Sequence, residues 1–240
     1  MLDRLKDWLR PLRPVLLPIW RRIRPSIDRA SRVPSPAAVV AARKAGERRR
    51  AEADRGEIRP ITKAEFDWVA RRYPYYRNRW AYTSAAAREA ADLISRHHLR
   101  TAIELGAHIR PLIVGADAMV LAPSADLDLE GKVVVQDARQ TPWAVPDGAY
   151  DLFVGLQVFE HLGDRQNAAF LEVCRVARNA VISLPIDWVM DNPANCHHGI
   201  THERALSWFA PHVPTRVVEG NAGRRRRVIY VFEDLDRAPA

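Results

Sequence analysis

Polar side chains follow the most apolar segment of this chain. The stretch YDLFVGLQVFEHL, residues 150–162, passes from an apolar run into Gln157, Glu160 and His161. Turn residues precede it, so we predict a strand over residues 152–156 that is covered on both faces, as in a parallel sheet. Open α/β sheets bind ligands at the carboxyl ends of such strands. Because an imidazole titrates near neutral pH, His161 is a candidate general base in a site there.

Two segments upstream have the same form, an apolar strand followed by polar residues. TAIELGAHIRP, residues 101–111, contains Glu104 and Gly106, and GKVVVQDAR, residues 131–139, contains Asp137. Three such junctions in this order resemble the class I methyltransferases that use S-adenosylmethionine. The likeness is greatest to the branch, similar to methyltransferase type 11, in which the segment after the fourth strand reads EHL.

The resemblance implies a cofactor, S-adenosyl-L-methionine, and residues that would bind it. Glu104 and Gly106 match the family pattern E/D-x-G, whose backbone passes under the amino-acid portion of the cofactor, although the second and third glycines are missing. Asp137 would accept a hydrogen bond from the adenine amino group, and the backbone N–H of Ala138 would meet a ring nitrogen. Gln157 would lie near the methyl donor.

One family position lacks its usual residue. The second strand, expected over residues 118–121, does not end in the acid that would bind both ribose hydroxyls. Asp117 precedes this strand, and Asp126 and Asp128 follow it as substitutes between which the spacing does not choose. The interval between the first two strands is also short, so we expect the helix between them to be truncated or absent.

A second polar cluster follows the fifth expected strand. SLPIDW, residues 183–188, is followed closely by NCHHG, which contains His197 and His198. These histidines and Asp187 should reach the acceptor side of the same cleft, beyond His161 on the cofactor side. The candidate catalytic residues are therefore His161, His198 and Asp187.

The same cluster invites a metal hypothesis. Cys196, His197, His198 and His202 are all types of residue that bind zinc. Adjacent ligands do not easily point at one ion, and the spacing matches no known zinc pattern, so we expect no metal site. We expect Thr201 instead to cap a helix that begins with His202.

Strands and helices alternate after residue 100, which favours an α/β fold with a parallel sheet. The expected strands cover residues 102–105, 118–121, 133–136, 152–156 and 180–184, with a clear helix at 165–176. Residues 216–219 and 228–232 flank a Gly- and Asn-containing turn and predict an antiparallel hairpin. The predicted fold class is a Rossmann-like, seven-stranded methyltransferase sheet with helices on both faces and a C-terminal antiparallel hairpin.

The preceding residues predict a helical cover and an extension. Thr62 opens a capping box, TKAE, and Ser84 is expected to cap a second helix that ends near residue 98. A cluster of aromatic residues lies between these two positions. We therefore divide the chain into a basic, partly helical or disordered extension, a helical cover and a methyltransferase-like domain, at residues 1–60, 61–99 and 100–240.

The charge of the chain lies mainly in that extension. Of 37 Lys/Arg and 29 Asp/Glu residues, the first 60 positions hold 16 basic and 7 acidic ones. Arg, Leu and Trp alternate with proline over residues 1–32, so this segment is a candidate for binding an anionic membrane surface. A nucleic-acid partner is not expected, because the basic runs lack interleaved aromatic residues and no nucleic-acid module is recognisable. Two cysteines and the absence of a long apolar span favour a cytoplasmic protein, peripheral at the membrane if the extension binds it.

Two functional hypotheses follow. The first is an S-adenosylmethionine-dependent methyltransferase that acts on a small molecule, a glycan or a lipid-linked acceptor. The second is a catalytically silent, methyltransferase-like subunit that binds and positions a partner, as the missing glycines and ribose acid suggest. Binding of S-adenosylhomocysteine would distinguish them, because a ligand of the native state must stabilise it.

Overall fold

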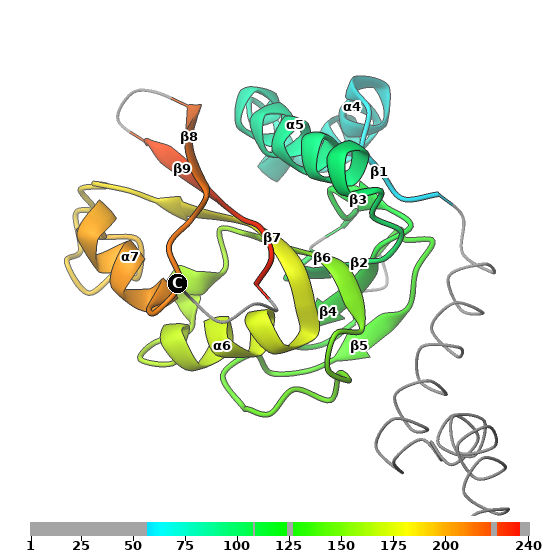
Figure 1. Cartoon of the computed structure of the whole chain (residues 1–240). Coiled ribbons are helices and arrows are strands. Elements are labelled where there is room, and N and C mark those ends of the chain that lie inside the picture. The colour runs from blue at the N-terminus through cyan, green and yellow to red at the C-terminus, as the bar shows by residue number, and fades with distance from the viewer. Residues whose placement is uncertain (1–56, 108, 124–126, 222–224, 236–240) are drawn as a thin grey trace, which may run out of the picture. The chain divides into compact units, whose positions relative to one another are not determined.

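The structure is a computed structural model that covers the whole chain (Figure 1). The residues that it describes are 57–107, 109–123, 127–221 and 225–235. These residues belong to one compact unit, Glu52–Ala240. The predicted membrane-binding segment, residues 1–32, lies outside the described residues. Within the described part, none of the helices is both long and apolar enough to cross a membrane.

A seven-stranded mixed sheet forms the centre of this unit. Its strands are β2 (Ala102–Leu105), β4 (Asp117–Val120), β5 (Val133–Val135), β6 (Tyr150–Leu156), β7 (Ala177–Pro185), β8 (Arg216–Asn221) and β9 (Arg227–Phe232). They lie in the order β5-β4-β2-β6-β7-β9-β8. The first five strands of that order are mutually parallel, and β9 is antiparallel to both β7 and β8. The predicted fold class and its closing hairpin are confirmed.

Helices cover both faces of the sheet, as predicted (Figure 1). The helices are α4 (Lys63–Arg72) and α5 (Trp80–His97) on one face, and α6 (Gln166–Val176) and α7 (His202–Phe209) on the other. Strand β6 shows why both faces need cover. Leu152 and Val154 pack in one core cluster with Leu93 of α5, whereas Phe153 packs in the other with Phe170 of α6.

The capping residues expected from the sequence predicted the start of the first helix correctly and the start of the second helix wrongly. Thr62 caps α4, and its capping box with Glu65 is complete. Helix α5, however, begins at Trp80, so the prediction that Ser84 caps it was wrong. The Ser84 hydroxyl lies inside the helix and donates to the carbonyl of Ala81, 3.0 Å away. A serine can satisfy its hydroxyl in this way within a helix, so the residue type alone does not mark a cap.

The segment between β2 and β6 has little regular structure besides its strands. Its described residues contain no helix, which agrees with the predicted loss of the helix after the first core strand. In that place a short strand, β3 (Ile113–Val114), pairs antiparallel with β1 (Arg59–Pro60) from the N-terminal cover. Leu121, just after β4, and Val135, on the edge strand β5, are 66% and 60% exposed.

Candidate functional site

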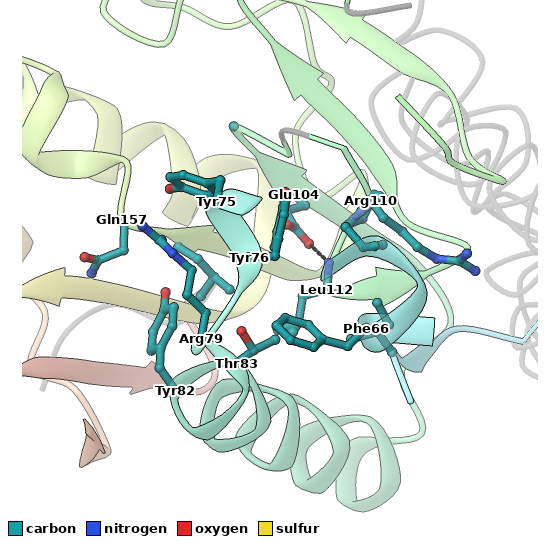
Figure 2. Close-up of a pocket in the computed structure, with 15 residues that line it drawn as sticks. Phe66, Tyr75, Tyr76, Arg79, Tyr82, Thr83, Glu104, Arg110, Leu112 and Gln157 are labelled. Carbon is teal, nitrogen blue, oxygen red and sulfur yellow. Dashed lines mark hydrogen bonds between the residues drawn. The ribbon is translucent and has the colours of Figure 1, made fainter. Parts of the chain in front are cut away.

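A pocket opens at the carboxyl ends of β2 and β6 (Figure 2). The chain runs from β2 toward β4 and β5 on one side, and from β6 toward β7 on the other, so the winding of the sheet reverses between them. Such reversals are where open α/β sheets bind ligands. The volume of the pocket, counted with its open mouth, is about 680 Å³. Helices α4 and α5 and the 3₁₀ turn η2 (Pro74–Tyr76) supply its other wall.

Glu104 places a buried carboxyl group in the wall of this pocket. It lies on β2, and its Oε2 accepts a hydrogen bond from the backbone N–H of Leu112 at 2.6 Å, the dashed contact in Figure 2. Burial raises the pKa of Glu104 to about 8, even though the N–H groups of Leu112 and Ile113 favour the charged form. A ligand cation in the pocket would therefore find a carboxyl group whose ionisation it could stabilise.

Gly106 follows β2 and also lines the pocket. Its φ angle is +74°, and a Cβ atom there would lie 2.7 Å from Cγ2 of Val158. Its N–H donates to the carbonyl of Met119 at 2.9 Å, which ties the turn to β4. The backbone conformation and the close approach of Val158 both require glycine here, so the one glycine retained from the family pattern is structurally necessary.

Gln157 lies at the end of β6, where the sequence predicted it, and lines the same pocket. Its φ angle is +57°, an uncommon conformation for a residue other than glycine. Its side-chain Oε1 accepts from Nε of Arg227 at 3.2 Å. Ser183 of β7 lies beside it and shares a 2.6 Å hydrogen bond with the hydroxyl of Tyr82 from α5. Segments far apart in the sequence therefore fix this wall of the pocket.

Two arginines near this wall form no ion pair with any described residue. Arg79 lies over the ring of Tyr75, 3.7 Å from its centroid, and runs toward Gln157 in Figure 2. Arg227 lies over the ring of Tyr82 at 5.0 Å. Burial, reinforced by the positive charge of Arg79, lowers the pKa of Arg227. Both guanidinium groups are therefore available to an anionic group on a ligand.

The adenine-side candidates lie after β5 and are not among the residues that line the pocket. Asp137 pairs with the side chain of Arg139 at 2.8 Å, and this partner lowers the pKa of Asp137 to about 2. Ala138 is buried, and its carbonyl accepts from Nε1 of Trp143 at 3.2 Å. To bind adenine, Asp137 would have to share its carboxylate with Arg139.

Leu121 directly follows the end of β4, where the resemblance would place an acid that binds ribose. Asp117 lies at the opposite end of that strand, where it accepts hydrogen bonds from the hydroxyl of Tyr150 and the N–H of Lys132. Asp128 pairs with Arg110 at 3.1 Å. Asp126 lies outside the described residues. The two described acids therefore have structural partners.

His161 converges with residues from the loop after β7. Its Nδ1 lies 3.3 Å from Sγ of Cys196, and that sulfur lies 3.4 Å from Nδ1 of His197. We expected His161 and His197 on different sides of the cleft. Their rings are instead in edge contact, with centroids 4.9 Å apart, because the 3₁₀ turn η3 (Phe159–His161) packs against that loop.

Glu160 lies beneath this cluster and was not singled out as a functional residue from the sequence. Its side chain is fully buried, with Oε1 3.7 Å from Nε2 of His197. Neither carboxylate oxygen accepts a hydrogen bond from any other described residue. Burial raises the pKa of Glu160 to about 8. Its place in the EHL segment was the available sequence signal, but burial could not be foreseen for a glutamate.

The other histidine and acid candidates lie outside the cluster. Nδ1 of His198 lies 3.1 Å from the backbone nitrogen of Met190 and holds the loop. Asp187 accepts from Arg226 at 3.1 Å, and its side chain is 59% exposed. His202 begins α7, which Thr201 caps as predicted, and its Nδ1 lies 3.0 Å from the hydroxyl of Tyr230.

Among known proteins, the chain is similar to several solved structures. No family model matches the chain, and no curated protein matches it. N-methyltransferase NodS from Bradyrhizobium japonicum WM9, in complex with S-adenosyl-L-homocysteine, is 15% identical, with a TM-score of 0.49 over 70% of this chain and 91% of that one. The bifunctional kinase-methyltransferase WbdD is 14% identical, with a TM-score of 0.45 over 62% of this chain and 38% of that one.

A third similar structure is geranyl diphosphate C-methyltransferase from Streptomyces coelicolor A3(2). It is 12% identical, with a TM-score of 0.40 over 56% of this chain and 69% of that one. We assign the fold of this chain from its own strand order. Five parallel strands, followed by an antiparallel β9 between β7 and β8, give it the class I methyltransferase fold.

Proposed function

We propose that this protein is an S-adenosylmethionine-dependent methyltransferase. The observation that carries the proposal is the pocket at the reversal of the sheet, where Glu104, Gly106 and Gln157 line one wall. These three residues match the family pattern in sequence and lie together in space. In a methyltransferase the cofactor supplies an activated methyl group, and the protein chiefly positions the reactants.

The residues present fit the methionine end of the cofactor. The buried carboxyl of Glu104 would face the ammonium group, and Gly106 would let the backbone approach closely. Asp137 and the N–H of Ala138 are proposed to bind adenine. At the ribose position Leu121 offers no hydrogen-bond acceptor from its side chain, so we expect the ribose to contribute less to affinity than the methionine portion does.

The acceptor is proposed to carry an anionic group. Arg79 lines the pocket and Arg227 lies beside it, both without an acidic partner among the described residues, and Arg227 is buried. A phosphate or carboxylate would complete their hydrogen bonding and offset the cost of burying their charge. A phosphorylated or acidic small molecule, glycan or lipid-linked sugar has this chemistry.

A hydroxyl acceptor would have to lose its proton during transfer. We propose that this occurs at the cluster that contains His161, Cys196 and His197. Of the three catalytic candidates, His198 is held by the backbone of Met190 and Asp187 by Arg226, whereas the His161 ring contacts only members of this cluster in the described hydrogen bonds.

Binding of S-adenosylhomocysteine to the full chain tests this function. Calorimetry should show saturable binding, and the melting temperature should rise with ligand concentration. Asp137→Ala should weaken binding by about 1–3 kcal/mol, the usual loss for a partner of a buried polar group. Asp164→Ala is the matched control, because the side chain of Asp164 is 91% exposed and, among the described residues, forms an ion pair only with its neighbour Arg165. Unchanged affinity in Asp137→Ala would remove Asp137 from the site.

A silent, partner-binding subunit is the second candidate function. The exposed Leu121 at the ribose position favours it, because a methyltransferase usually has an acid there. The same experiment decides between the two functions. No stabilisation by either S-adenosylmethionine or S-adenosylhomocysteine would support the silent subunit and contradict the enzyme.

A further inference from the structure

The strongest unassigned feature of the described residues is the cluster of His161, Cys196 and His197. One ligand atom from each residue lies within 4.8 Å of the other two. We propose that this cluster binds a zinc ion, with Nδ1 of His161, Sγ of Cys196 and Nδ1 of His197 as ligands. The same cluster is where the proposed function places proton loss from the acceptor. Metal binding itself needs neither the cofactor nor the pocket, so it can be tested separately from methyl transfer.

The two separations between the sulfur and the imidazole nitrogens are close to those that zinc requires. The sulfur of Cys196 lies 3.3 Å from Nδ1 of His161 and 3.4 Å from Nδ1 of His197. With bonds of about 2.3 Å to sulfur and about 2.0 Å to nitrogen, a tetrahedral site holds S and N ligands about 3.5 Å apart. Small side-chain movements would therefore suffice to admit an ion. The mixture of one thiolate and two imidazoles suits zinc, a borderline-soft ion, better than magnesium or calcium.

A second, independent observation points to the same site. The buried carboxylate of Glu160 has no hydrogen-bond donor among the other described residues. It faces Nε2 of His197, at 3.7 Å, while Nδ1 of the same ring faces Cys196. A histidine that binds zinc through one nitrogen almost always donates its other N–H to a carboxylate or carbonyl group. We assign Glu160 this positioning role, which explains why an unpaired carboxylate is buried here.

The two segments that supply the ligands are held in place by other contacts. In η3, the N–H of His161 donates to the carbonyl of Val158 at 2.9 Å. On the other segment, the ring of Trp188 stacks on His197 with centroids 5.6 Å apart, and the N–H of Gly199 closes the loop on the carbonyl of Trp188. Asn195 Oδ1 also lies 2.8 Å from Nδ1 of His197, a contact that the ion would replace.

The linear sequence pointed to a different set of ligands. It grouped Cys196 with His197, His198 and His202, and both the adjacency and the spacing of these residues argued against a metal. In the structure the side chains of the adjacent Cys196 and His197 nevertheless converge, with Sγ 3.4 Å from Nδ1. In the structure His198 and His202 are held elsewhere, and His161, from another strand end, takes their place. Three protein ligands leave a coordination position for water or a substrate group. The cluster adjoins the pocket, because Arg227 contacts both Gln157 of the pocket and the ring of Trp188.

Cobalt(II) substitution of the full chain tests the proposal without any assay of activity. After treatment with a chelator, added Co²⁺ should give one equivalent of binding and a thiolate-to-cobalt absorption band, which Zn²⁺ should abolish by displacement. Cys196→Ala should lose the band, and His161→Ala should bind at least about tenfold more weakly. Glu160→Gln should weaken binding by about 10–100-fold, as expected for the carboxylate partner of a ligand histidine.

Matched controls come from the same chain. Cys174→Ala removes the other cysteine, and His202→Ala removes a histidine that lies outside the cluster, so both should bind Co²⁺ like the unmodified chain. In the Cys174→Ala chain, Zn²⁺ should also protect Cys196 from a thiol reagent. Absence of the band from the unmodified chain, full binding by Cys196→Ala or absence of this protection would each overturn the proposal.

Discussion

Glu104 connects the chemistry of the pocket to the stability of the fold. Its carboxyl group is buried, and its pKa of about 8 lies above the ordinary value of 4.5. Between those two values the folded state holds a proton that the unfolded state releases. The stabilising contribution of protonated Glu104 is therefore complete below pH 4.5 and is lost as the pH rises through 8.

Glu104→Gln should remove this pH dependence. Glutamine can still accept the N–H of Leu112 but cannot ionise, so the variant should gain stability relative to the unmodified chain as the pH rises from 5 to 8.5. The upper limit of the gain is about 5 kcal/mol, from 1.36 kcal/mol per pKa unit. Urea unfolding at several pH values measures it. Parallel stability curves for the two proteins would show that Glu104 is already charged in the folded state.

Gly106 is the position at which an added methyl group should be most damaging to the site. Gly106→Ala would put a residue with a side chain at a positive φ angle and would place its Cβ atom 2.7 Å from Val158. Gly148 also has a positive φ angle, +58°, but a Cβ atom there would meet no atom within 4 Å. Gly148→Ala is therefore the control for the φ angle alone. We expect Gly106→Ala to unfold more easily than Gly148→Ala by about 1–3 kcal/mol, the usual cost of overpacking. Equal urea midpoints would mean that Val158 moves aside freely.

Among the elements, strand β9 brings a charged side chain, Arg227, to the candidate site. Because it runs antiparallel to β7, its first residue, Arg227, pairs with Pro185 at the carboxyl end of β7. A parallel strand would have placed that end of the hairpin at the opposite edge of the sheet. The closing hairpin therefore brings a guanidinium group to Gln157 and to the wall of the pocket.

Arg227→Gln should weaken the binding of anions at this edge. Inorganic pyrophosphate should raise the melting temperature of the unmodified chain, and the variant should bind it about 10–100-fold more weakly, as expected for the loss of a charge-assisted hydrogen bond. The adjacent Arg226 is the matched control, because it already pairs with Glu219 and Asp187. If Arg226→Gln weakens pyrophosphate binding as much as Arg227→Gln does, the effect is one of overall charge and not of a site.

Across the whole molecule, charge is distributed unevenly. The first 60 residues carry the whole excess of basic over acidic residues, and Trp8 and Trp20 lie among them. Basic residues near aromatic ones favour the surface of an anionic membrane, at about 1 kcal/mol for each Lys or Arg close to that surface. If the protein has the proposed activity and its acceptor is lipid-linked, this segment would hold the protein at the membrane that contains the acceptor.

Deletion of residues 1–32 should abolish sedimentation of the protein with anionic liposomes. The truncated protein should keep its affinity for S-adenosylhomocysteine, because the pocket lies in the described part of the chain. Binding of the full chain should also weaken with added salt, since exposed charges are screened over about 10 Å at 0.1 M. Equal sedimentation of the two proteins would contradict the membrane hypothesis.

Consecutive residues were sufficient to predict the main elements of this fold. The capping box at Thr62, the apolar strands and the alternation of strands with helices are short-range patterns, and the order of the strands predicted the sheet. The resemblance to the methyltransferases added Glu104, Gly106 and Gln157 as cofactor-binding candidates, and all three line the pocket at the carboxyl ends of β2 and β6. The start of α5 was missed, since Ser84 bonds within the helix where a cap was expected.

The composition of the site was decided by tertiary packing. Tyr82 reaches Ser183 because α5 packs on the sheet, and Arg227 reaches Gln157 because β9 is antiparallel. His161 meets Cys196 across a separation of 35 positions because two strand-end loops pack together. Glu104 and Glu160 are buried, whereas other acidic residues of the chain are exposed. Residue type alone cannot predict which acidic residues are buried. The sequence therefore determined which edge of the sheet carries the site, and the packing of distant segments determined which side chains face one another there.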